Sequence, residues 1–241
     1  ASEIKKSTAT NFSKLLEICA IEQPKIRIRF STSNPQDMSL DVIRIMAKYE
    51  NICNHIHLPV QSGSNKILNE MNRQHSREEY LELINKIKDI IPDCSISQDI
   101  IAGFPGETEE DHKQTLDLME TVKYSFGYMF KYSERPGTVA QRKLLDDVDE
   151  PTKKRRLQEI VELQRNHSLV RTKEFLNKEV EVLIEKTSKK SKLYWSGKNK
   201  QNTVVVFPKE NYNVGDFVKV KITDCTSATL LGRAIGYSKN N

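Results

Sequence analysis

Residues 54–64 read Asn54-His55-Ile56-His57-Leu58-Pro59-Val60-Gln61-Ser62-Gly63-Ser64, a short apolar strand that runs out into a polar loop with a glycine. Two later segments have the same form, at 99–107 and 128–138. In α/β folds, ligands bind at the carboxyl ends of parallel strands. The three strand-to-loop exits therefore predict one functional rim at one edge of a parallel sheet.

Strand and helix patterns alternate on both sides of this stretch. Apolar periodicity predicts strands at 25–30, 55–60, 95–102 and 126–130 and helices at about 12–20, 40–47, 76–91, 108–122 and 151–176. Ser76 and Glu79 form a capping-box pattern, and Pro151 stands where a first helical residue is expected. Connections of this length predict a parallel sheet covered by helices. Four strands do not close an eight-stranded barrel, so either the sheet is open or the sequence is a piece of a longer one.

The pattern changes after Leu176. Five short runs of alternating or β-branched residues, punctuated by glycines, follow within about sixty residues. This pattern is typical of a small five-stranded antiparallel β-barrel of the oligonucleotide-binding kind. We therefore expect two domains, an α/β domain at 1–175 and a β-barrel domain at 176–241.

Charge also distinguishes the two expected domains. The 241 residues carry a net charge of +5, but residues 176–241 hold twelve Lys/Arg against six Asp/Glu, and residues 1–175 hold 26 against 27. The basic excess thus belongs to the C-terminal domain. A sign asymmetry of this kind indicates an anionic partner for that domain, most often nucleic acid.

The clearest basic stretch is 186–200, which has six lysines, no acidic residue, and the aromatic residues Tyr194 and Trp195. Lysines supply phosphate contacts and aromatic rings supply stacking platforms in nucleic-acid binding. The alternative is a solvated hairpin whose Trp195 lies in the barrel core. We predict RNA contacts from Lys186, Lys189, Lys190, Lys192, Trp195, Lys198 and Arg233.

Two loops of the rim carry polar groups suited to a cofactor. The side chains of Gln61-Ser62-Gly63-Ser64 can hold a zwitterionic amino-acid group, but the same residues also suit an ordinary βα turn with Ser64 as helix N-cap. Phe104-Pro105-Gly106-Glu107 leads into a helix N-terminus, where anions and polar cofactor groups bind. The alternative there is a glycine-rich connection capped by Thr108.

No metal site, membrane span or signal peptide is expected from the sequence. Metal-ligand spacing is absent among the four cysteines, Cys19, Cys53, Cys94 and Cys225. Buried, reduced thiols of a cytosolic protein are the expected state. His55 and His57 face the same side of a strand, but no third ligand is near them in the sequence. No apolar run is long enough to cross a membrane, and the N-terminal residues lack the apolar core of a signal peptide.

Three motifs, taken together, resemble one family. In order and spacing, the radical-SAM methylthiotransferases match His57-Leu58-Pro59-Val60-Gln61-Ser62-Gly63-Ser64, Asp99-Ile100-Ile101-Ala102-Gly103-Phe104-Pro105-Gly106-Glu107-Thr108 and Tyr132-Ser133-Glu134-Arg135-Pro136-Gly137-Thr138. The C-terminal domain resembles their TRAM domain. Its residues 196–207 resemble the branch of the family that acts on tRNA.

The resemblance implies a fold, cofactors and a reaction. The first domain would be the last four βα units of a TIM-like partial (βα)6 barrel. In the family, S-adenosylmethionine chelates a [4Fe–4S] cluster on a Cys-x-x-x-Cys-x-x-Cys loop and is split reductively. A second [4Fe–4S] cluster carries the sulfur, and a methylthio group is added to carbon 2 of an isopentenyl-adenosine beside the anticodon. Neither set of cluster cysteines is in this sequence, so we expect the C-terminal part of such an enzyme, without a cluster or activity of its own.

The resemblance also implies site residues and partners. The S-adenosylmethionine contacts would come from Gln61, Ser62, Gly63, Ser64, Asp99, Ile101 and Gly103. The acid expected three residues after the motif glycine Gly103 is replaced by Gly106, with Glu107 next to it, which leaves the role of Glu107 open. The implied partners are the tRNA anticodon arm and an electron donor such as a flavodoxin, and the implied state is a cytoplasmic monomer.

Alternative functions remain open at this point. A methylthiotransferase for a ribosomal protein tends to read Gln-His-Ala-Ser in the first loop, so Gly63 argues against that branch. The branch that acts on threonylcarbamoyl-adenosine keeps the glycine. An alternative of a different class is a non-catalytic RNA-binding module.

Overall fold

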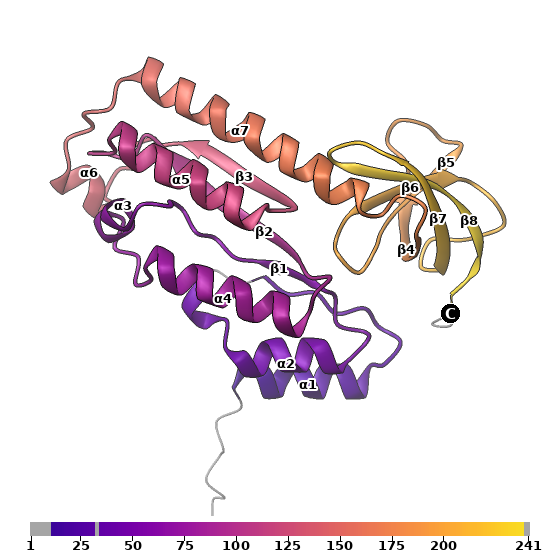
Figure 1. The fold of residues 1–241 in the computed structure, drawn as a ribbon. Helices are drawn as coiled ribbons and strands as arrows, with labels where there is room; N and C mark the ends of the chain where they lie inside the picture. The colour runs from indigo at the N-terminus through magenta and orange to yellow at the C-terminus, as the bar shows by residue number, and fades with distance from the viewer. Residues whose placement is uncertain (1–10, 32–33, 239–241) are drawn as a thin grey trace, which may run out of the picture.

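The computed structural model describes residues 11–31 and 34–238, which form a helix-covered parallel sheet followed by a small closed β-barrel (Figure 1). The sheet has the strand order β1-β2-β3, with β1 (His55–His57), β2 (Ser95–Ala102) and β3 (Phe126–Lys131). The helices around it are α1 (Phe12–Glu22), α2 (Leu40–Lys48), α3 (Asn65–Glu70), α4 (Arg77–Ile90), α5 (Glu109–Val122), α6 (Val139–Lys143) and α7 (Glu150–Lys173), with a 3-10 turn at η1 (Pro35–Asp37).

The two faces of the sheet have different characters. Ile96, Ile100 and Ala102 of β2 belong to one apolar cluster with buried residues of α2, α4, α5 and α7. Because successive strand residues point to opposite sides, Ser97 and Asp99 lie on the other face. The polar face is therefore available for chemistry, and the apolar face holds the helices in place.

Local sequence sets where the main helices begin. Ser76 caps α4 and Thr108 caps α5, each with a complete capping box in which the side chain three residues later bonds back to the cap. Asp149 caps α7, and a proline follows at the start of that helix. The predicted capping box at Ser76 is confirmed.

The second domain is a closed barrel with the strand order β4-β5-β6-β8-β7. Its strands are β4 (Glu179–Thr187), β5 (Tyr194–Lys198), β6 (Val204–Pro208), β7 (Phe217–Cys225) and β8 (Thr229–Tyr237). Alternate apolar residues of these strands form its core, including Val182, Val205, Phe207 and Val220, all of which are fully buried. The predicted architecture, a parallel α/β unit followed by a five-stranded barrel, is confirmed.

Two details of the predicted fold are wrong. The segment predicted as a strand at 25–30 forms only one bridge, between Ile28 and Ile52, and the side chains of Arg27 and Arg29 reach the second domain instead. The barrel is not wholly antiparallel, because β6 and β8 pair in parallel. A closed ring with an odd number of strands cannot alternate direction all the way round, so a five-stranded barrel must contain at least one parallel pair.

The second domain meets the first at the amino-terminal end of the sheet. Arg27 forms an ion pair with Glu181 at 2.8 Å, and Asp93, just before β2, accepts a hydrogen bond from Gln201 at 2.6 Å. In Figure 1, the small barrel lies at the C-terminal end of α7, and α3 and α6 lie at the opposite end of the sheet. The two ends of the sheet thus carry different elements.

Candidate functional site

The three loops that follow the strands leave the sheet at the same edge. All three strands run in parallel, and the ladder extends past β1 through a bridge between Gln61 and Ile100. The backbone N–H of Gln61 donates to the Asp99 carbonyl at 2.8 Å, and that of Tyr132 donates to the Ala102 carbonyl at 2.8 Å. The prediction that the three loops leave one edge of a parallel sheet is confirmed.

A small apolar cluster ties the three loops together. Ile67, Phe104 and Tyr132 each follow a different strand, and they are buried against one another. The rings of Phe104 and Tyr132 meet edge to face, with centroids 5.1 Å apart. This contact orders the loops, since side chains packed in this way restrict the backbone that carries them.

The first loop is held against α5. Gln61 is buried and adopts φ of 71°, a left-handed conformation that is uncommon for a residue with a side chain. The Ser62 hydroxyl is fully buried 3.3 Å from the Thr115 hydroxyl, and the backbone N–H of Gly63 donates to the same Thr115 oxygen at 2.9 Å. A Cβ on Gly63 would lie 2.5 Å from the Gln114 carbonyl oxygen, so glycine is required by the close approach of the helix.

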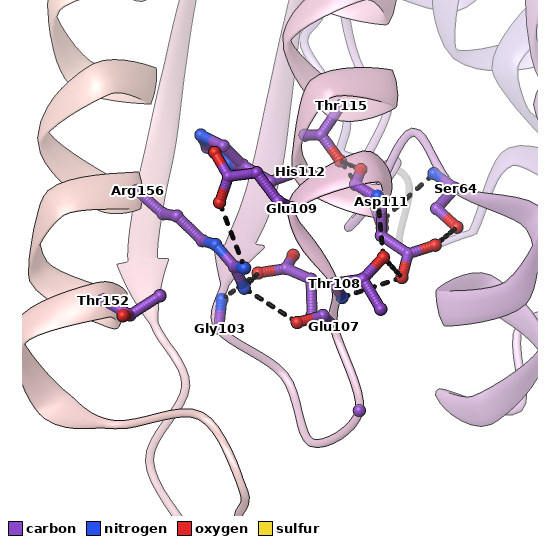
Figure 2. A network of polar contacts seen from close by, with 12 residues as sticks. Ser64, Gly103, Glu107, Thr108, Glu109, Asp111, His112, Thr115, Thr152 and Arg156 are labelled. Atoms are coloured by element: carbon purple, nitrogen blue, oxygen red, sulfur yellow. Dashed lines mark hydrogen bonds and ion pairs between the residues drawn. The ribbon is translucent and has the colours of Figure 1, made fainter.

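One carboxylate connects the first loop to the second. Ser64 caps α3, and its hydroxyl donates to Asp111 Oδ1 at 2.6 Å, while the backbone N–H and the hydroxyl of Thr108 donate to Asp111 Oδ2 (Figure 2). Lys66 also contacts Asp111, at 3.2 Å. Burial acts to raise the pKa of Asp111, but the hydrogen bonds from Ser64 and Thr108 dominate and lower it to about 2. The carboxylate therefore stays ionised and fixes both helix starts.

The second loop closes on itself through Glu107. Glu107 Oε2 accepts a hydrogen bond from the Gly103 N–H at 2.7 Å and one from Arg156 Nη1 at 2.9 Å, and the same Arg156 nitrogen reaches the Glu107 carbonyl at 2.9 Å (Figure 2). Burial raises the pKa of Glu107, and the Gly103 N–H and Arg156 partly offset this. Glu107, the acid that stands one position later than expected, thus bonds directly to the motif glycine.

Gly103 is needed for conformation and for space. Its φ of +73° favours glycine, and an added Cβ would lie 2.3 Å from Cγ of the buried Lys153. Lys153 reaches from α7 to Asp146, and its ammonium lies 5.4 Å from the ring centre of Tyr132. Two buried cations of α7, Lys153 and Arg156, therefore pack against the second loop and hold it in place.

The sequence prediction missed Lys153 and Arg156. The residues of α7 that are buried toward the sheet are mostly polar, and they recur at helical spacing: Lys153, Arg156, Ile160, Gln164, His167, Ser168 and Thr172. Polar residues that recur at helical spacing along one side of this helix are the sequence signal that could have revealed the buried network. Gln164 belongs to the same set of buried polar residues, and its amide donates a hydrogen bond to the Tyr124 carbonyl at 2.9 Å.

The polar face of the sheet carries a chain of contacts below the rim. Ser97 Oγ lies 3.0 Å from His55 Nε2 and 2.9 Å from His57 Nδ1, so the two histidines face the same side, as predicted. Burial lowers the pKa of His55 to about 3, which keeps it neutral. His57 Nε2 lies 3.4 Å from Asp99 Oδ1, which is too long for a strong hydrogen bond, and this buried oxygen has no hydrogen-bond partner among the described residues.

The basic residues of the second domain lie away from the rim. Lys186, Lys189, Lys190, Lys192 and Arg233 are exposed, and Lys198 is half-buried and bonded to Asn202. Trp195 is half-buried against the barrel core, and the ammonium of Lys209 lies 4.1 Å from its ring centre. The lysines therefore face solvent, and Trp195 is shared between the core and the surface.

The cysteines and histidines form no metal site in the described part of the chain, where no three His, Cys, Asp or Glu residues gather closely enough to hold an ion. All four cysteines are free thiols. The prediction that they are buried is wrong for Cys19, which is exposed on α1 because it falls on the solvent side of that helix. Among residues 11–31 and 34–238, no helix combines the length and apolar character needed to cross a bilayer.

The match with known proteins covers both domains. The model of the radical SAM superfamily matches residues 7–119, and the TRAM domain model matches residues 173–235. The chain is 68% identical over its whole length to a tRNA-2-methylthio-N(6)-dimethylallyladenosine synthase of Christiangramia forsetii, and 66% identical to the protein of that name from Flavobacterium johnsoniae. It covers 50% of each of these relatives.

Among solved structures, the chain is similar to coproporphyrinogen III oxidase from Escherichia coli, a radical SAM enzyme, with 16% identity and a TM-score of 0.46 over 85% of this chain and 50% of that chain. The family matches and the identity of the synthases extend over the sheet, its rim and the small barrel. The chain therefore contains a match to the radical SAM superfamily and a match to the TRAM domain, and it spans about half the length of the curated relatives that it matches.

Proposed function

We propose that this chain is the part of a tRNA methylthiotransferase that cradles S-adenosylmethionine at its rim and grips RNA with its small barrel. The complete enzyme would add a methylthio group to carbon 2 of an isopentenyl-adenosine, also called dimethylallyladenosine, beside the anticodon. The observation that carries the proposal is the 68% identity, over the whole chain, to a protein named for this activity. In this proposal, residues 1–175 are the unit that binds the cofactor and residues 176–241 are the unit that binds RNA.

The rim fits the polar part of S-adenosylmethionine. Asp99 Oδ1, which lies 3.4 Å from His57 Nε2 and has no hydrogen-bond partner among the described residues, can accept a hydrogen bond from a ligand amino or hydroxyl group. The left-handed backbone at Gly103 lets a flat group approach the chain closely. Gln61 and Ile101 would complete the contact surface, whereas the buried hydroxyls of Ser62 and Ser64, which face Thr115 and Asp111 of α5, hold the loop in place and are not available to the cofactor. Bound there, S-adenosylmethionine supplies the radical chemistry of the family, and the residues of this chain orient it and exclude water.

The described residues do not fit an iron–sulfur cluster, because their cysteines lie far apart. We propose that the complete protein has two [4Fe–4S] clusters and that this chain holds neither. Anaerobic reconstitution of the 241-residue chain should then give no stoichiometric cluster absorption. A band of that kind would overturn this part of the proposal.

The small barrel would hold the anticodon arm through charge. The lysines at 186, 189, 190 and 192 are exposed, and the segment 186–200 contains no acidic residue. Such contacts read phosphates and not bases. An electron donor such as a flavodoxin, a monomeric state and a cytoplasmic location complete the proposal.

The test of RNA binding uses the whole chain and a fluorescent RNA hairpin with an unpaired loop. Each lost phosphate contact should lower the slope of log affinity against log salt by about 0.7 for a single strand, so Lys189, Lys190 and Lys192, changed together to Ala, should lower it by about 2. The control changes Lys25, Lys113 and Lys154, three exposed lysines of the first domain, to Ala. Affinity that is flat with salt, or equal losses in both variants, would contradict the proposed grip.

A second test addresses the cofactor. In the complete enzyme with its clusters in place, Asp99→Asn should weaken the binding of S-adenosylmethionine, measured by calorimetry. The affinity for RNA should stay unchanged. Cofactor binding that does not depend on Asp99 would remove the carboxylate from the site.

A further inference from the structure

A cavity of about 480 Å³ lies between the two domains. Its walls come from the amino-terminal ends of β2 and β3, from the C-terminal half of α7, and from the β5–β6 and β7–β8 turns of the barrel. The volume falls within the roughly 300–1,000 Å³ that is usual for small-molecule sites. The cavity lies at the end of the sheet opposite the rim, so it is separate from the candidate cofactor site.

Aromatic rings and an unmet hydrogen-bonding group line this cavity. Phe126 and Tyr128 of the edge strand β3 have ring centroids 6.3 Å apart, and Tyr128 is 56% exposed. Ser95 is only 6% exposed, and its hydroxyl has no hydrogen-bond partner among the described residues. Buried hydroxyls are normally bonded, so this one is suited to a ligand with a polar edge.

The unpaired charge at the wall is positive. Arg165 of α7 is exposed and makes no hydrogen bond or ion pair within the described part of the chain. Both acids of the wall are engaged, since Asp93 accepts a hydrogen bond from the Gln201 amide and Glu174 pairs with Arg171 at 3.1 Å. A guanidinium without a partner suits a phosphate group.

We propose that this cavity binds one unpaired nucleotide of an RNA strand. The base packs against Phe126 and Tyr128, its polar edge meets the Ser95 hydroxyl, and its phosphate pairs with Arg165. Lys198 lines the same cavity and lies at the opposite end of β5 from the lysines at 189, 190 and 192, so an RNA strand held by those lysines would reach the cavity along β5. The inference rests on the proposed function, because it assumes that the barrel grips RNA.

The bound nucleotide differs from the one that is modified. β2 has eight residues and so spans about 26 Å from the cavity end to the rim. A nucleotide in the cavity is therefore several positions away along the strand, and the cavity would fix the register of the RNA relative to the rim. This gives the junction of the domains a role in choosing the modified position.

The test compares affinities for the hairpin in the whole chain. Ala228 is an exposed turn residue at the cavity, and Ala228→Trp should fill the space and weaken binding roughly 5- to 150-fold, the loss expected for one stacked base. Arg165→Gln should lower the salt slope by about 0.7, the value of one phosphate contact. Lys113→Gln, the same change at an exposed lysine of α5, should have no effect, and thermal unfolding should show that all three variants fold.

Crosslinking locates the nucleotide directly. A hairpin with 4-thiouridine in its loop should crosslink to the tryptic peptide 124–131, which carries Phe126 and Tyr128. If the change of Lys189, Lys190 and Lys192 weakens binding but the cavity variants do not, and the crosslinks stay within 186–200, the cavity is excluded and the proposed function stands. If the unaltered chain does not bind the hairpin at all, both fail.

Discussion

Replacing Arg156 with Met should destabilise the first domain strongly, because it would strand a buried carboxylate. The side chains of Arg156 and Glu107 are only 5% and 1% exposed. Without the guanidinium, the Gly103 N–H is the only hydrogen-bond donor that the described residues leave to the Glu107 carboxylate. Removing one partner of a buried ion pair costs about 3–5 kcal/mol, because the other charge is left uncompensated.

The matched control is the neighbouring residue, Arg155. It pairs with Glu109 and Glu159 on the surface and is 46% exposed, so Arg155→Met should cost less than about 1 kcal/mol. Guanidinium unfolding followed by circular dichroism at neutral pH gives both values. If the two variants lose equal stability, the buried pair does not have the energetic role assigned to it.

A double variant tests the cause of the loss. Glu107→Gln removes the charge, so the Glu107→Gln/Arg156→Met variant should recover at least half of the stability lost in Arg156→Met. Burial already raises the pKa of Glu107, and losing Arg156 should raise it further. A raised carboxyl pKa favours the fold in its protonated form, so the penalty of Arg156→Met relative to the double variant should shrink as the pH falls toward about 4.5. A penalty that does not change with pH would refute the argument.

Three further changes probe other parts of the structure. Gly63→Ala should cost about 1–3 kcal/mol in denaturant unfolding, because the new Cβ would lie 2.5 Å from the Gln114 carbonyl oxygen; an unchanged midpoint would contradict this. His55→Gln should make the free energy of unfolding depend less on pH in acid. Burial lowers the pKa of His55 to about 3, so the unaltered chain loses about 1.4 kcal/mol of stability per pH unit as the pH falls from about 6.5 toward 3. Equal pH dependence in both proteins would count against it. Trp195→Ala should destabilise the small barrel by about 2–4 kcal/mol, since its ring is half-buried beside Lys209; unchanged stability would mean that the ring is free to stack on a base.

Much of the fold followed from periodicity and capping. The helices that begin at Ser76 and Thr108 carry their start signals within four residues, and such signals act locally. The short helices α3 and α6 were not predicted, because five or six residues are too few to show a period. The bridge at Ile28 shows the opposite error, since an alternating pattern predicted a strand where the arginine side chains instead contact the second domain.

The candidate site was predicted in its loops and not in its supports. Gln61 to Ser64 and Gly103 to Glu107 are contiguous motifs that can be read from the chain. Arg156 lies 49 residues after Glu107, and its role depends on how α7 crosses the sheet, which no local pattern specifies.

The sequence by itself determined the strand and helix order, the charge division and the motifs that mark the family, because each depends on residues close together in the chain. The tertiary structure decided the rest. It brought Ser64 to Asp111 and Gly103 above Lys153, and it set the basic barrel at the end of the sheet opposite the rim. The physical reason is that burial and the pairing of distant charges depend on which surfaces pack together, and packing is a property of the folded chain as a whole.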